Sequence, residues 1–184
     1  MRLNRFIGDF DLSKDLVKIT NPENIKQIKD VLRMKIGENI ILSDGLGKKV
    51  EGKIISLSSV LIEVKILKEF VVKEPKRKVN LYLAILKKEN FIWAVQKAVE
   101  CGVTNIIPII TERTIKTGIN IVRLNKIIRE ACEQCGRSIL PVLREILKFE
   151  KDLTKNEKGE GNSSAFEKII FHPTGQIHTS NKNT

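Results

Sequence analysis

The sequence predicts an α/β protein that begins with a small β-barrel or β-sandwich and continues as a parallel α/β sheet. Before residue 73, apolar residues recur at every second position between Gly, Asp and Ser, a pattern typical of half-buried strands. After that point, buried-strand stretches alternate with helical ones, as in parallel sheets with crossover helices. A length of 184 residues with 41% hydrophobic residues allows one large domain or two small ones.

The front half contains three stretches with strand periodicity, residues 39–45, 49–59 and 60–72. They are preceded by one predicted helix over residues 21–33, with Asn21 as its N-cap, Pro22 at its first position and Glu23 in its first turn. The charged, proline-containing stretch "KEPKRK", residues 73–78, is typical of a linker. We therefore predict one domain over residues 1–72 and a second over residues 73–184.

The back half alternates strand and helix. The predicted elements, in order, are a strand over 79–86, a helix over 89–102, a strand over 105–110, helices over 120–136 and 144–153, a polar loop over 154–164 and a strand over 166–173. Glycines close the helices that end at Gly102 and Gly136.

The helix over 120–136 carries a Cys-x-x-Cys pair, Cys132 and Cys135. A redox pair usually lies at a helix N-terminus, but this one lies in the last turn, where the helix dipole raises the thiol pKa. A zinc site would need further ligands from Cys101, His172 or His178, of which the two histidines lie far along the chain. We therefore expect no metal site, and expect both cysteines to help pack an amphipathic helix.

Charge points to the class of partner. The chain has 33 Lys and Arg against 22 Asp and Glu, a net charge of +11, of which residues 73–184 carry +8. This excess favours a polyanionic partner such as nucleic acid, although a lysine-rich organism would also produce it. The lack of a long apolar run and of a signal-like start, with an odd count of three cysteines, indicates a cytoplasmic protein without membrane association.

Polar residues beside the cysteines share a helical face. Glu130, Gln134 and Arg137 are spaced at i, i+4 and i+7, and Glu133 and Arg137 form an i,i+4 pair. On spacing alone, this stripe is more typical of a solvated helix surface than of a functional site.

The stretches "LYLAILKKENFIWAVQKAVECGVTNIIPIITERT" and "RLNKIIREACEQCGRSILP" resemble the RsmE family, the 16S ribosomal RNA uridine-N3 methyltransferases of the SPOUT superfamily. The departures from the family pattern are mild: Cys101 replaces the usual leucine and Thr114 the usual serine. The matching residues are Leu83, Ala84, Lys87, Gln96, Lys97, Ala98, Glu100, Gly102, Val103, Ile106, Pro108, Glu112, Arg113, Glu130, Ala131, Glu133, Gln134, Arg137 and Pro141.

The front half resembles the same family's PUA-like barrel through "RFIGDF" and "VLRMKIGENIILSDGLGKKVEGKI". The lysine-rich "IKQIKD" replaces a histidine that often precedes Val-Leu-Arg in the family. "FHPTG", residues 171–175, resembles the His-Pro strand that leads into the family's methyltransferase core. The family's Gly-Pro-Glu-Gly-Gly and Leu-Gly-x-x-x-Leu-Arg-x-Glu-Thr-Ala motifs do not occur in this sequence, so the resemblance implies an incomplete SPOUT domain that stops before the trefoil knot.

The resemblance implies S-adenosylmethionine as cofactor, 16S rRNA of the small ribosomal subunit as partner, and a homodimer when the knot is intact. Candidate RNA-binding residues are Arg5, Arg33, Lys35, Lys87, Lys97, Arg113 and Arg137. Candidate cleft-shaping residues are Gln96, Glu100, Glu133 and Gln134, and candidate cofactor-binding residues are His172 and Pro173. No residue is identified as the general base. A non-catalytic RNA-binding module and a basic scaffold without RNA affinity remain the alternatives.

Overall fold

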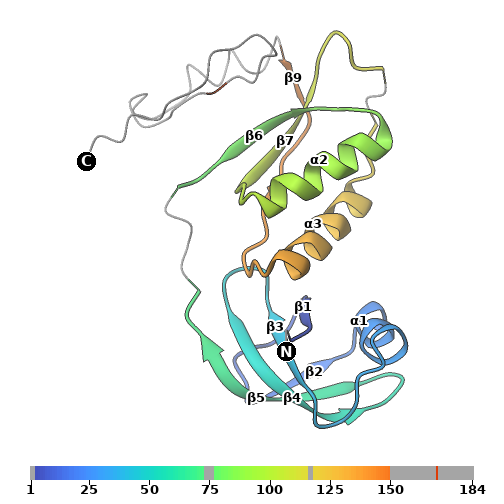
Figure 1. Ribbon diagram of the computed structural model, residues 1–184, viewed down its shortest axis with the longest axis vertical. Coiled ribbons are helices and arrows are strands. Elements are labelled where there is room, and N and C mark those ends of the chain that lie inside the picture. The colour runs from blue at the N-terminus through green and yellow to red at the C-terminus, as the bar shows by residue number, and fades with distance from the viewer. Residues whose placement is uncertain (1–2, 73–76, 116–117, 150–168, 170–184) are drawn as a thin grey trace, which may run out of the picture.

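The computed structural model describes residues 3–72, 77–115, 118–149 and 169. Two sheets divide this part of the chain, and Figure 1 places the blue-to-teal N-terminal half beneath the green-to-orange α/β half. None of the helices in these ranges is long and apolar enough to cross a membrane.

The N-terminal half is a half-barrel sheet of five strands in the order β1-β3-β4-β5-β2. The strands are β1 Arg5–Ile7, β2 Leu16–Ile19, β3 Asn39–Ser43, β4 Lys49–Leu57 and β5 Ile62–Phe70. β1 pairs with β3 in parallel, and the other pairs are antiparallel. The three longer strands confirm the prediction from period-two spacing, whereas β1 and β2, of three and four residues, are too short to show a pattern.

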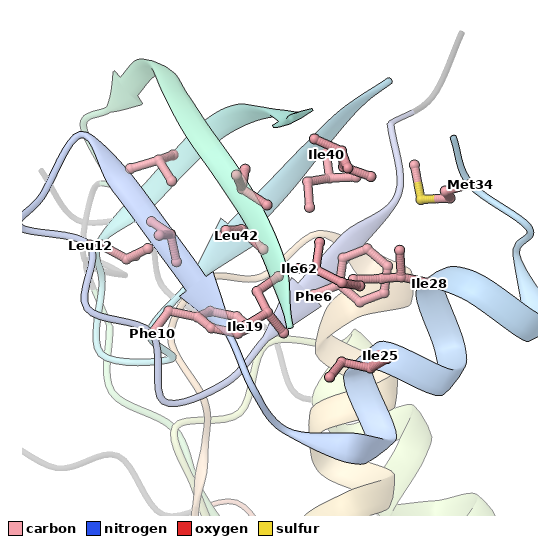
Figure 2. Close-up of a cluster of buried hydrophobic side chains, with 14 residues drawn as sticks. Phe6, Phe10, Leu12, Ile19, Ile25, Ile28, Met34, Ile40, Leu42 and Ile62 are labelled. Carbon is pink, nitrogen blue, oxygen red and sulfur yellow. The ribbon is translucent and has the colours of Figure 1, made fainter. Parts of the chain in front are cut away.

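A short helical segment covers the core of this sheet. Its side chains Ile25 and Ile28 pack with Phe6 and Ile62 from the strands (Figure 2), and Phe6, Ile28 and Ile62 are fully buried. The remaining members of the cluster are Phe10, Leu12, Val17, Ile19, Met34, Ile40, Leu42, Val50, Ile54 and Val64.

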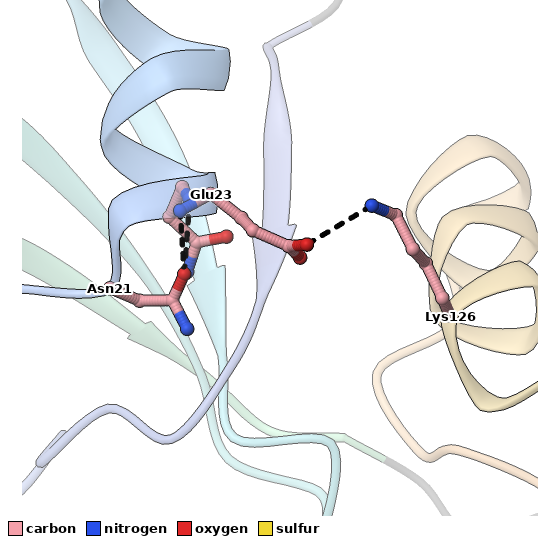
Figure 3. Close-up of polar contacts among 4 residues, drawn as sticks. Asn21, Glu23 and Lys126 are labelled. Atoms are coloured by element: carbon pink, nitrogen blue, oxygen red, sulfur yellow. Dashed lines mark hydrogen bonds and ion pairs between the residues drawn. The ribbon is translucent and has the colours of Figure 1, made fainter. Parts of the chain in front are cut away.

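The predicted helix over 21–33 is an α-helix, α1 Pro22–Lys26, followed by one π-helical turn, η1 Gln27–Val31. The N-cap prediction is confirmed, because the Asn21 side chain accepts hydrogen bonds from the backbone N–H groups of Glu23 and Asn24 (Figure 3). The helix ends before Arg33, whose φ of 51° lies in the left-handed region.

The second half is a parallel sheet, as predicted, with β7 Asn105–Ile110 flanked by β6 Asn80–Ala84 on one side and by β8 Val142–Leu143 and β9 Leu147–Lys148 on the other. Helices α2 Lys88–Glu100 and α3 Ile121–Cys135 lie side by side over one face of it (Figure 1). Their buried side chains, including Val95 and Ile128, share one cluster with Ile106 of β7. Both helices run antiparallel to the strands, so their C-termini lie at the amino edge of the sheet.

The predicted helix over 144–153 is wrong for residues 144–148. Leu147 pairs with Ile109 of β7 to form β9, and Ile146 packs against the helix-covered core. Pairing with a strand distant in sequence overrides the local helical spacing here. Several predicted segments lie outside the described residues. They are the part of that helix beyond residue 149, linker residues 73–76, the loop over 154–164, and the strand over 166–173 apart from residue 169.

Candidate RNA-binding surface and domain junction

A half-buried carboxylate joins the two halves. The Oε1 atom of Glu133, in the last turn of α3, accepts a hydrogen bond of 2.7 Å from the backbone N–H of Ile7 in β1. Burial raises the pKa of Glu133, and the hydrogen bond from Ile7 and the charge of Arg129 oppose that rise. The Ile7 side chain is itself buried among α2 and α3 residues, although its strand belongs to the half-barrel.

A second set of contacts joins the β3–β4 turn to the segment after α3. Ser43 Oγ donates to the Ser138 carbonyl at 3.1 Å, and the Leu140 N–H donates to the Gly45 carbonyl at 2.9 Å. Leu46 and Ile139 add an antiparallel bridge next to them. Residues 136–140, "GRSIL", therefore form part of the surface against which the half-barrel packs.

Arg5 lies at the same junction. Its half-buried guanidinium packs against Gly136, the left-handed residue that ends α3, and comes within 3.5 Å of the place where a Cβ would stand. Its Nε lacks a hydrogen-bond partner within the described part of the chain. A cation at the C-terminus of a helix is stabilised by the helix carbonyls, so this position holds Arg5 against α3.

Arg137 follows Gly136 and is no longer part of the helix. Its Nη1 donates a 2.9 Å hydrogen bond to the Val99 carbonyl, at the C-terminal end of α2. The predicted i,i+4 pair of Glu133 and Arg137 is not among the ion pairs of the described residues, since the left-handed glycine turns the two side chains toward different partners.

Three of the four predicted cleft-shaping residues meet in a groove between α2 and α3. Gln96, Glu100 and Gln134 line it, and it encloses about 530 Å³. The predicted RNA-binding Lys97 lies beside it and forms a 2.7 Å ion pair with Glu100. The other lining residues are Ile92, Arg123, Lys126, Ile127 and Glu130.

Arg123 and Lys126 are groove residues that sequence reasoning missed. They lie seven and four residues before Glu130, which was placed on this face, so the helical spacing could have found them. Lys126 also pairs with Glu23 of α1 at 3.2 Å across the two halves of the protein (Figure 3).

Two predicted residues lie at the carboxyl edge of the parallel sheet. Lys87 precedes α2 and is exposed, and Arg113 is exposed in the turn after β7. That turn is fixed by the Thr111 N–H donating to Thr114 Oγ1 at 2.9 Å and the Thr114 N–H donating to the Thr111 carbonyl at 3.0 Å. Ligands of open α/β sheets bind at this edge, so both cations are placed where a substrate would be expected.

Arg33 and Lys35 lie together on the half-barrel. Both are exposed and flank the buried Met34 directly after η1. An arginine in the left-handed region is strained, and both strained residues and π-helical turns concentrate at functional sites. The structure thus separates these candidate cations into three groups: a carboxyl-edge group of Lys87 and Arg113, a half-barrel group of Arg33 and Lys35, and a junction group of Arg5 and Arg137.

The cysteine pair shows no sign of thiol reactivity. Cys132 is fully buried, and this burial raises its pKa to about 12. Cys135 is exposed, so the expectation that it packs the helix is wrong, because the helix turns its last residue toward solvent. Within the described residues, no group of three or more His, Cys, Asp and Glu could hold a metal ion, and His172, Pro173 and His178 lie outside them.

Comparisons with known families agree with this architecture. Residues 73–183 match the family described as "RNA methyltransferase domain", and residues 19–67 match the "RNA methyltransferase PUA domain". Two curated relatives are named ribosomal RNA small subunit methyltransferase E: one from Rickettsia conorii, 26% identical over 85% of this chain, and one from Buchnera aphidicola, 28% identical over 96%. The chain spans 64% and 70% of the length of these two relatives.

Similar solved structures include a protein of the same name and a putative methyltransferase. The ribosomal RNA small subunit methyltransferase E from Neisseria gonorrhoeae, bound to S-adenosylmethionine, has a TM-score of 0.74 and 32% identity, over 84% of this chain and 65% of that one. A putative methyltransferase from Legionella pneumophila, also with bound cofactor, has a TM-score of 0.72 and 30% identity, over 80% of this chain and 64% of that one. The chain therefore belongs to the RNA methyltransferase family that includes ribosomal RNA small subunit methyltransferase E.

Proposed function

We propose that this protein takes part in methylation of small-subunit ribosomal RNA, with N3 of a uridine in 16S rRNA as the methyl acceptor and S-adenosylmethionine as the donor. The observation that carries the proposal is the family match over both halves of the chain, 19–67 and 73–183. The bound S-adenosylmethionine of two similar structures supports the choice of donor.

RNA contact is assigned to both parts of the chain, a barrel domain over 1–72 and a methyltransferase domain over 73–184. Arg33 and Lys35 contact RNA from the first, and Lys87 and Arg113 from the second. These four side chains are exposed, and both the flexible ammonium of lysine and the forked guanidinium of arginine suit phosphate oxygens. The junction positions of Arg5 and Arg137 and the Lys97–Glu100 ion pair make these three cations weaker candidates for RNA contact.

Methyl transfer to N3 of uracil requires an in-line approach, loss of the imide proton and donors that offset the charge on the uracil oxygens. Lys87 and Arg113, at the carboxyl edge of the sheet, contribute by holding the RNA phosphates, which orients the base for this approach. None of the described carboxylates lies there with a geometry that identifies it as the general base, so we assign none.

The α2–α3 groove does not fit the cofactor. Six of its eight lining residues are polar or charged, and only Ile92 and Ile127 are apolar. We therefore assign no role in binding S-adenosylmethionine to the residues of this groove. His172 and Pro173 remain the predicted cofactor-binding residues.

Methylation is tested directly by incubating the protein with an intact knot together with small ribosomal subunits or 16S rRNA and radiolabelled S-adenosylmethionine. The expected result is one labelled nucleoside, identified by mass spectrometry as N3-methyluridine. A methyl group at another position would overturn the assignment of N3, and RNA that is neither bound nor labelled would overturn the whole proposal.

A non-catalytic RNA-binding module is the second candidate. It is favoured by the exposed cations Arg33, Lys35, Lys87 and Arg113, which can bind RNA phosphates without methyl transfer. Salt-dependent RNA binding without label transfer would select it over the enzyme. We further propose a cytoplasmic location and, for the protein with an intact knot, a homodimer, which sedimentation analysis would detect as a doubled mass.

A further inference from the structure

The contacts between the half-barrel and the α/β half point to a structural role for Glu133. We infer that Glu133 is a positioning residue, which fixes the orientation of the half-barrel so that the cations of both halves reach one RNA together. The RNA part of this inference rests on the proposed function. The fixed orientation itself does not depend on it.

Glu133 is a half-buried charge at the junction. Its carboxylate loses part of its hydration, which raises its pKa, and the Ile7 N–H compensates as a donor at 2.7 Å. Removing a carboxylate from water has a desolvation cost, so we look for its benefit in the geometry that it fixes. Here it fixes β1, which carries Arg5 and begins the half-barrel sheet.

Other contacts at the junction support a rigid attachment. The bonds between Ser43 and Ser138 and between Gly45 and Leu140 hold the β3–β4 turn, and the exposed Glu23–Lys126 ion pair adds a weaker contact between α1 and α3. β1, the β3–β4 turn and α1 are separate segments of the half-barrel, and three attachment points fix an orientation. The halves therefore behave as one body despite the linker-like composition of residues 73–78.

This rigidity has a consequence for RNA affinity. When two binding surfaces are fixed relative to each other, the second contact forms as an intramolecular event, and loosening them lowers the effective concentration. Loss of the Glu133 acceptor should thus weaken RNA binding without removing any cation from either surface.

The test compares Glu133→Ala with Glu133→Gln in the full chain. Both remove the same charge, but glutamine keeps an acceptor for the Ile7 N–H, whereas alanine leaves that donor unpaired. Glu145→Ala is the charge-matched control, because Glu145 is exposed in the loop between β8 and β9. The readouts are amide hydrogen exchange at residues 5–7 and affinity for a 16S rRNA fragment at fixed salt.

For Glu133→Ala we expect at least about tenfold faster exchange at Ile7 and about tenfold weaker RNA binding. Glu133→Gln should keep most of the wild-type protection from exchange at Ile7 and most of the RNA affinity. Glu145→Ala should exchange at wild-type rates and bind RNA no more weakly than wild-type protein. Unchanged exchange in Glu133→Ala would overturn the attachment, and faster exchange with undiminished RNA affinity would overturn the positioning role. If wild-type protein does not bind the RNA, the proposed function fails, while the exchange data still test the attachment.

Discussion

Replacement of Gly45 by alanine tests how tightly the two halves pack. Gly45 has a φ of 75°, and a Cβ placed there would lie 2.8 Å from Leu140 Cδ1 and 3.2 Å from Ile7 Cγ2. A left-handed alanine costs about 1–2 kcal/mol, and overpacking adds about 1–3 kcal/mol. We therefore expect Gly45→Ala to lower the free energy of unfolding by about 2–5 kcal/mol.

Gly37→Ala is the matched control for the backbone contribution. Gly37 has a φ of 96°, and a Cβ placed there would have no neighbouring atom within 4 Å, so only the backbone cost applies. The entropy that alanine removes from the unfolded chain is the same for both and cancels in the comparison. Urea denaturation followed by far-UV circular dichroism measures the difference, expected to be about 1–3 kcal/mol. Equal destabilisation by the two substitutions would refute the tight contact between the halves.

The remaining predictions concern single groups and the cofactor. Arg137→Gln should lower the melting temperature, because the Val99 carbonyl keeps its bond from the Gly102 N–H but loses the one from Arg137. It should leave the salt dependence of RNA binding unchanged; a shallower salt slope would instead make Arg137 a phosphate contact. The pKa of Cys132 rises from 9.0 to about 12, so between those pH values the folded state keeps a proton that the unfolded state loses. The free energy of unfolding should therefore fall as the pH rises through this range, and it should fall less steeply in Cys132→Ala. The pKa of Asp11 is lowered to about 2, chiefly by a hydrogen bond from Lys14, and an NMR titration of Lys14→Ala should return it toward 3.8; an unmoved value would rule out that cause. Calorimetry of residues 1–184 with S-adenosylmethionine should give no measurable heat, since the glycine-rich knot motif is absent from them, and micromolar binding would contradict that placement of the cofactor site.

Long periodic segments made most of the fold predictable from the sequence. The alternation in residues 49–57 and 62–70, and the apolar stripe of α3 closed by Gly136, correspond to β4, β5 and α3. The failures are short elements stabilised by distant partners. β1 exists because it pairs with β3, and β9 because it pairs with β7.

The candidate site was predictable by residue type but not by location. Helical spacing placed Gln134 on one face with Glu130, and both line the groove. It also grouped Glu133 and Arg137, which contact Ile7 and Val99 instead. The left-handed turn at Gly136 and the docking of a separate domain decide those contacts. Neither can be read from the periodicity of one helix.

The most direct test of RNA binding at the carboxyl edge is the salt dependence of binding to a 16S rRNA fragment by wild-type protein and by Lys87→Gln/Arg113→Gln. If both cations contact phosphates there, the slope of log K against log salt should become shallower by about 1.4–1.8 in the double variant. Arg137→Gln, measured alongside, should keep the wild-type slope. Identical slopes for wild-type protein and the double variant would contradict the assignment of RNA binding to this edge of the sheet.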